Sequence, residues 1–140
     1  MININVYNES AIKYIQVKLL AKAVKYVADK EIKRNGEITV VICTDGFIHE
    51  MNVKYLGHDY PTDVITFEID DNPLEGEIYI SGETAKMQSL DYNVSFRDEI
   101  LRLAIHGALH LAGYTDDTDE LRMKMSQIED KYLKEIKAGA

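Results

Sequence analysis

Apolar and polar residues alternate at the start of the chain. In Ile2–Tyr7 the apolar side chains fall at every second position, which is the period of a strand buried on one face. Over residues 12–26 they recur every three or four positions instead, which predicts a long helix with one apolar face. Asn8 or Ser10 offers the N-cap of this helix, and Asn35-Gly36 is expected to end it.

The middle of the chain has the patterns of strands. The run Glu37–Thr44 is mostly apolar, which predicts a strand buried on both faces. A short helix is expected over 47–55. Two further strands, Asp63–Ile69 and Glu77–Ile80, are separated by a polar turn over 70–76, so we expect them to form an antiparallel hairpin.

Helical spacing returns at Ser81 and continues almost to the end. Breaks fall near Asn93 and at Gly113, and the last helix is expected over 117–136. The resulting order of elements is β-α-β-α-β-β-α-α-α. It predicts an α+β fold in one domain, residues 1–140, with a small mixed sheet of about four strands and helices packed on it.

Composition narrows the class of protein. A chain of 140 residues with 46% hydrophobic and 29% charged residues is long enough for one core. Its one cysteine, Cys43, rules out a disulfide framework and a cysteine-based zinc site, and we expect it to be a small core residue. No segment approaches the roughly 20 apolar residues of a membrane span. We therefore expect a soluble, cytoplasmic protein with no membrane partner.

The net charge of −8 argues against a protein that coats nucleic acid without specificity. The charge is unevenly distributed, because residues 1–44 carry seven Lys and Arg against four Asp and Glu, whereas the rest carry nine against twenty. Lys18, Lys22 and Lys25 form a stripe on the first predicted helix. This stripe is either a solvated helix face or a contact for RNA phosphates.

The candidate chemistry lies in the penultimate predicted helix. His106 and His110 are four residues apart, so a helix presents both imidazoles on one face. Gly113 can adopt a positive φ and turn the chain back, which brings Asp116 within reach. Two imidazoles and a carboxylate leave one position of a tetrahedral zinc open, as in catalytic sites. The alternative is a pair of buried histidines held by ordinary hydrogen bonds.

The same spacing matches the frame of the metzincin metallopeptidases. In that frame the residue after the first histidine is a glutamate that acts as general base. Here this residue is Gly107, which cannot accept a proton. A peptidase is therefore less favoured, and we assign no general base.

Two blocks of sequence resemble the YbeY family. His106–Tyr114 reads H-G-A-L-H-L-A-G-Y, with acidic residues close behind, and is similar to that family's signature. Asn52–Phe67 resembles its segment N-x-x-Y-R-x-K-D-x-P-T-D-V-L-S-F, and Gly76-Glu77-Ile78 resembles its G-D-I turn and strand. The resemblance implies a bacterial endoribonuclease specific for single strands. It further implies action in 16S ribosomal RNA 3′-end maturation and ribosome quality control, with precursor RNA and the small ribosomal subunit as partners and no DNA.

The chain departs from the family pattern at two positions. The pattern has histidine where Asp116 stands, so the third ligand becomes a carboxylate, with the adjacent Asp117 as an alternative. The pattern has arginine where Leu56 stands, and leucine cannot bind a phosphate or stabilise developing negative charge. Candidate substrate contacts in the same region are Lys54, His58, Thr62 and Asp63.

The sequence thus predicts a zinc-dependent endoribonuclease with one Zn²⁺ per chain on His106, His110 and Asp116. A second hypothesis is a catalytically weak ribosome-assembly factor that uses the metal structurally, since Leu56 replaces an arginine. A third is the metallopeptidase, which Gly107 disfavours.

Overall fold

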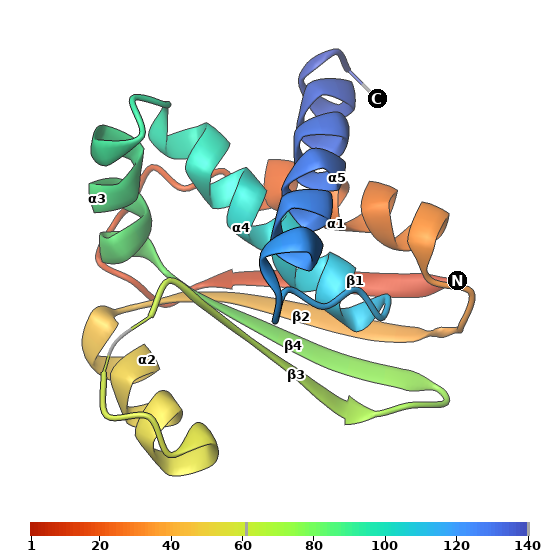
Figure 1. Ribbon diagram of the computed structural model, residues 1–140, viewed down its shortest axis with the longest axis horizontal. Helices are drawn as coiled ribbons and strands as arrows, with labels where there is room; N and C mark the ends of the chain where they lie inside the picture. The colour runs from red at the N-terminus through yellow and green to blue at the C-terminus, as the bar shows by residue number, and fades with distance from the viewer. Residues whose placement is uncertain (61, 140) are drawn as a thin grey trace.

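A computed structural model of the protein describes residues 1–60 and 62–139 (Figure 1). Its four strands form one mixed sheet in the order β1-β2-β4-β3. The pairs β1·β2 and β2·β4 are parallel, and β3 runs antiparallel along β4 at the edge. The strands are β1 (Ile2–Asn8), β2 (Gly36–Cys43), β3 (Val64–Asp70) and β4 (Leu74–Ser81). The small mixed sheet with helices packed on it confirms the predicted α+β class.

Three helices lie on one side of the sheet (Figure 1). They are α1 (Val17–Glu31), α4 (Phe96–Leu111) and α5 (Asp119–Lys137), and α4 contacts both of the others. The shorter α3 (Gly82–Asp91) follows β4 directly and also packs on α4. On the opposite face lies α2 (Asp45–Met51), which continues into one π-helical turn, η1 (Asn52–Leu56). None of the helices described in residues 1–60 and 62–139 has the length and apolarity needed to cross a bilayer.

The helix α4 lies unusually close to the sheet. A Cβ built on Gly107 would stand 2.6 Å from Cγ2 of Ile78, and one built on Gly76 would stand 2.7 Å from Cδ1 of Leu111. These two glycines therefore let the helix and β4 approach each other from both sides. The close contact fixes which edge of α4 faces the sheet, and with it the direction of His106 and His110.

The first helix is shorter than predicted. It begins at Val17 rather than near Asn8 or Ser10, and Gln16 precedes it without a side-chain cap. The polar groups of Asn8 and Ser10 are used in a local turn instead, in which the side-chain oxygen Oδ1 of Asn8 accepts from the Ser10 amide and hydroxyl. The helix ends at Glu31, not at Asn35, because the next residue is extended and buries its side chain.

Two strand predictions also need correction. β2 is fully buried on one face only, since Thr39 and Val41 stay partly exposed where α2 leaves the sheet open. The turn predicted over 70–76 is shorter, because β4 already begins at Leu74, whose side chain lies in the core. Cys43 is buried as expected. From the sequence we also expect Pro61 to end any helix before it, and this residue lies outside the described residues.

Candidate metal centre

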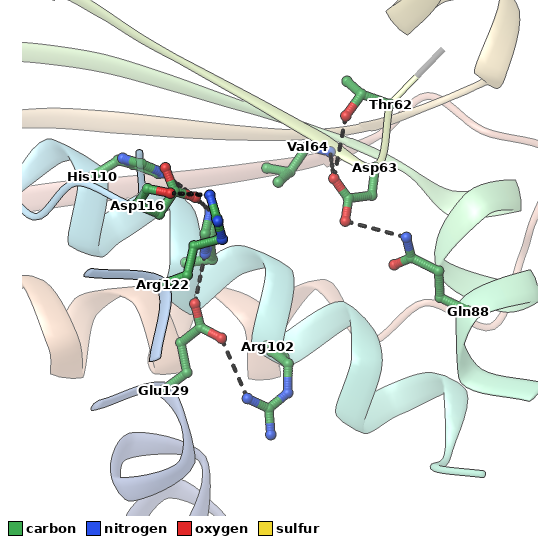
Figure 2. Close-up of polar contacts among 10 residues, drawn as sticks. Thr62, Asp63, Val64, Gln88, Arg102, His110, Asp116, Arg122 and Glu129 are labelled. Atoms are coloured by element: carbon green, nitrogen blue, oxygen red, sulfur yellow. Dashed lines mark hydrogen bonds and ion pairs between the residues drawn. The ribbon is translucent and has the colours of Figure 1, made fainter. Parts of the chain in front are cut away.

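Three side chains converge near the C-terminal end of α4, and Figure 2 shows two of them, His110 and Asp116, side by side. The Nε2 atoms of His106 and His110 lie 3.0 Å apart. Oδ2 of Asp116 lies 3.4 Å from the first and 3.5 Å from the second. Ligand bonds of about 2.0–2.2 Å in tetrahedral geometry require separations of this size. Among the described residues, this is also the one group of three His, Cys, Asp or Glu ligand atoms that all lie within 4.8 Å of one another.

The return loop after α4 brings the carboxylate back to the helix. Gly113 has a φ of +106°, a conformation that favours glycine, and its amide donates to the carbonyl of His110. Nη1 of Arg122 then donates to the backbone carbonyl of Asp116 at 3.2 Å. The neighbouring Asp117 is exposed and is not part of the cluster. The geometry therefore favours Asp116 over Asp117.

A half-buried carboxylate, that of Glu31, anchors this loop to the rest of the fold. The hydroxyl of Tyr114 donates to Oε1 of Glu31 at 2.8 Å, and the hydroxyl of Tyr132 donates to the other oxygen of Glu31. The hydrogen bond to Glu31 raises the pKa of Tyr114, and partial burial and the charge of Glu31 act in the same direction. The last residue of α1 thus connects the loop that carries Asp116 to α5.

The orientation of His106 is set by a residue of α5. Its Nδ1 lies 2.5 Å from Oε2 of Glu129, and because a carboxylate only accepts, Nδ1 carries the proton. The lone pair of Nε2 is then free and faces His110. Burial lowers the pKa of His106, but the hydrogen bond and charge of Glu129 outweigh it, so that the pKa is raised. Arg102 in turn donates to Glu129 at 3.3 Å. A histidine ligand backed by a carboxylate is the usual arrangement at protein zinc sites.

Sequence reasoning missed Glu129, although a signal was present. It lies on the buried face of α5 together with Met125, Tyr132 and Ile136. A carboxylate on an apolar helix face needs a partner, so its position could have marked it as bound to a buried histidine or arginine. The partner itself could not be named from the spacing.

The cluster opens into a cleft of about 500 Å³ between α4, the edge strand β3 and the segment after η1. Of the predicted substrate contacts, His58, Thr62 and Asp63 line it. Lys54 does not, since it lines a separate groove on the other side of η1 and lies over the ring of Tyr55. Leu56 lines the cleft with 46% of its surface exposed.

Two side chains hold the walls of this cleft. Nδ2 of Asn52 donates to the carbonyl of Tyr60 at 2.8 Å and fixes the loop that carries His58. The carboxylate of Asp63 accepts from the amide of Val64 at 2.8 Å and from Nε2 of Gln88 at 3.3 Å (Figure 2). Hydrogen bonds from β3 and α3 therefore hold Asp63, which is not part of the ligand cluster.

Two nitrogen donors and one carboxylate oxygen suit zinc and related divalent transition metals. Three features make the cluster fit such an ion. They are the types of its donor atoms, the separations of 3.0–3.5 Å between these atoms, and the side that is open to the cleft. Three ligands on one side leave room for a water molecule and a substrate oxygen on the other. The arrangement can support metal-assisted hydrolysis.

Comparisons with known proteins find one family over nearly the whole chain. A family model described as Endoribonuclease YbeY matches residues 3–137. A protein of Chlorobaculum parvum named Endoribonuclease YbeY is 42% identical over 127 residues, covering 90% of each chain. One of Chlorobaculum tepidum with the same name is 43% identical over 120 residues, covering 85% of this chain and 88% of the other. The solution structure of TM1509 from Thermotoga maritima is 31% identical with a TM-score of 0.67, covering 95% of this chain and 88% of the other.

Proposed function

The chain belongs to the YbeY endoribonuclease family, and we propose on that basis that it cleaves single-stranded RNA by zinc-assisted phosphodiester hydrolysis. Membership supports a hydrolytic nuclease. The proposal adds the metal, its three ligands His106, His110 and Asp116, and the single-stranded substrate. We further propose that the natural substrate is the 3′ end of precursor 16S ribosomal RNA in the cytoplasm, cut on the small ribosomal subunit during maturation and quality control.

The cluster of ligand atoms is the observation that supports this proposal most strongly. Its separations of 3.0–3.5 Å leave one side open to a cleft of about 500 Å³. Zinc at this position would make bound water more acidic and polarise a phosphoryl oxygen. The lining of the cleft includes Asp63 and Glu68, whose charges repel phosphate, so the RNA backbone is expected to approach at the metal side.

The protein's own residues position these reactants. Glu129 holds the tautomer of His106 in which Nε2 is free to bind a cation. His58 stacks on Tyr60 with ring centroids 5.4 Å apart and reaches the mouth of the cleft, where it can donate a hydrogen bond to a phosphate oxygen. The acidic net charge of the chain argues for recognition at this cleft rather than for coating of RNA.

The metal and the activity are tested together. Elemental analysis of untagged protein is expected to find about one zinc per chain, as for one three-ligand site. The variant His110→Ala should lose the zinc and the cleavage of a single-stranded RNA. The control His49→Ala changes a partly exposed histidine outside the cleft and should keep both. Zinc retained in full by His110→Ala would contradict the ligand assignment. Cleavage of an unstructured peptide instead of RNA would support the metallopeptidase.

A catalytically weak assembly factor remains the second candidate because Leu56 puts an apolar side chain in the cleft where the family pattern has arginine. The variant Leu56→Arg tests it. A marked gain in RNA cleavage means that this position limits catalysis. No cleavage by either protein, with zinc bound in both, supports the assembly factor with a structural metal.

A further inference from the structure

A second, smaller cleft adjoins the candidate metal centre. It has a volume of about 270 Å³ and shares Asp63, His106 and Asp116 with the larger one. Its other walls come from the end of α3, the middle of α4 and the buried face of α5. The proposed hydrolysis assigns no role to three of the residues that line it, namely Gln88, Tyr92 and Glu99.

Glu99 is the most unusual group in this cleft. Only 3% of its surface is exposed, and no hydrogen bond or ion pair within residues 1–60 and 62–139 reaches its carboxylate. Its oxygens are nevertheless not sealed off as Oε1 of Gln88 is, and they open on the cleft. Burial raises its pKa and the charge of Arg102 opposes that change, but the guanidinium of Arg102 donates to Glu129 and Asp130 instead. A buried carboxylate without a donor is costly. Glu99 therefore offers two acceptor oxygens to whatever enters the cleft.

Gln88 offers a further acceptor beside it. Its Nε2 donates to Asp63, while its Oε1 is buried and has no hydrogen-bond partner in residues 1–60 and 62–139. Figure 2 shows this amide facing Asp63 from α3. The unsatisfied groups of Gln88 and Glu99 are all acceptors, so a ligand that fits them must bring N–H or O–H donors.

Tyr92 indicates that the ligand is flat. The residue is 63% exposed and lines the cleft. Single-stranded RNA is commonly recognised by stacking an unpaired base on an aromatic ring while its edge is hydrogen-bonded. Glu99 precedes His106 by seven residues, or two turns on the same face of α4, which is about 10 Å along the helix. One nucleotide can span that distance with its phosphate at the metal centre.

We propose that this cleft binds a guanine base next to the scissile phosphodiester, with Glu99 accepting hydrogen bonds from its Watson–Crick edge and Tyr92 stacking on its ring. Guanine is the one RNA base that presents a ring N–H and an amino group side by side, which a carboxylate can accept together. The inference rests on the proposed function and adds a base preference to it. A second cation is the less suitable occupant, because Glu99 belongs to no group of three close His, Cys, Asp or Glu ligand atoms among the described residues.

The experiment measures the binding of guanosine, adenosine, cytidine and uridine 5′-monophosphate to zinc-loaded protein by isothermal titration calorimetry. The four share one phosphate, so differences in Kd report the base. Guanosine monophosphate should bind most tightly, and Glu99→Gln should weaken it about tenfold or more, since charge-assisted hydrogen bonds are lost, with the other three nearly unchanged. Tyr92→Ala should weaken all four by similar factors, because stacking tolerates every base. Glu120→Gln, on an exposed glutamate of α5, is the matched control and should change nothing.

Several results would overturn the inference. They are equal affinity for the four nucleotides, no measurable binding of guanosine monophosphate, or a guanine preference that persists in a folded Glu99→Gln protein. Two bound metal ions per chain that fall to one in Glu99→Gln, without base preference, would assign the cleft to a cation. RNA cleavage without base preference would refute this inference alone. Guanine binding that depends on Glu99, in a protein that cleaves no RNA, would refute only the proposed function.

Discussion

The variant Gly107→Ala tests the close contact that orients the two histidines. The added methyl would stand 2.6–2.9 Å from three carbon atoms of Ile78, which is fully buried in the central part of the sheet. Overpacking of this kind destabilises a protein by about 1–3 kcal/mol, whereas replacing glycine by alanine within a helix stabilises it by about 1 kcal/mol. We expect the free energy of unfolding to fall by about 1 kcal/mol. Urea unfolding of metal-free protein, followed by circular dichroism, measures it without the contribution of bound zinc.

A double-mutant cycle shows whether Ile78 is the cause. Ile78→Ala alone should cost about 2–5 kcal/mol because it leaves a cavity in the core. In that background the new methyl group has room, so Gly107→Ala should be neutral or stabilising by up to about 1 kcal/mol. If Gly107→Ala destabilises both backgrounds equally, the contact with Ile78 does not explain the glycine. The same contact bears on the peptidase hypothesis, which requires a glutamate as general base at position 107. A side chain at this position would point to Ile78 in the sheet and not into the cleft.

Three further predictions follow from the surroundings of the site. Glu129→Gln should lower zinc affinity about tenfold to a hundredfold in a chelator competition assay. Asp130→Asn, which alters the exposed neighbour, should lower it far less, and equal losses would contradict a specific role. Tyr114→Phe removes a half-buried hydrogen bond and should lower the free energy of unfolding in urea by about 1 kcal/mol. The control Tyr7→Phe, at an exposed position, should leave it unchanged. The thiol of Cys43 is buried, and its pKa is raised to about 11. Little thiolate therefore forms at pH 8, and Ellman's reagent should label this thiol only after unfolding. Rapid labelling of the native protein would refute this expectation.

The site was predictable from the sequence where its geometry is local. His106 and His110 share a face because every α-helix places residues four apart in that way, and Gly113 permits the turn that returns Asp116. These relations need no knowledge of the rest of the fold. Whether the cluster holds zinc stays a prediction.

The residues around the ligands were not predictable in the same way. Glu129 reaches His106 from 23 positions away on another helix, and Glu31 reaches Tyr114 from 83 positions away. Lys54 looked equivalent to its neighbour His58 in the sequence, yet η1 directs it to a different groove. Each of these outcomes depends on how helices pack on the sheet, which a local pattern does not encode.

The sequence by itself determined the kinds of element, the mixed sheet with helices on it, and the pair of histidines, because hydrophobic periodicity and helical spacing act over a few residues. It misplaced the start of α1, because Asn8 and Ser10 satisfy each other in a turn as readily as they cap a helix. Only the tertiary structure decided that Glu129 supports His106 and that Asp116 faces the histidines while Asp117 faces solvent. It also decided that Glu99 is buried beside the site with no hydrogen-bond partner among residues 1–60 and 62–139. The physical reason is that burial and partner choice are set by contacts between elements distant in the chain.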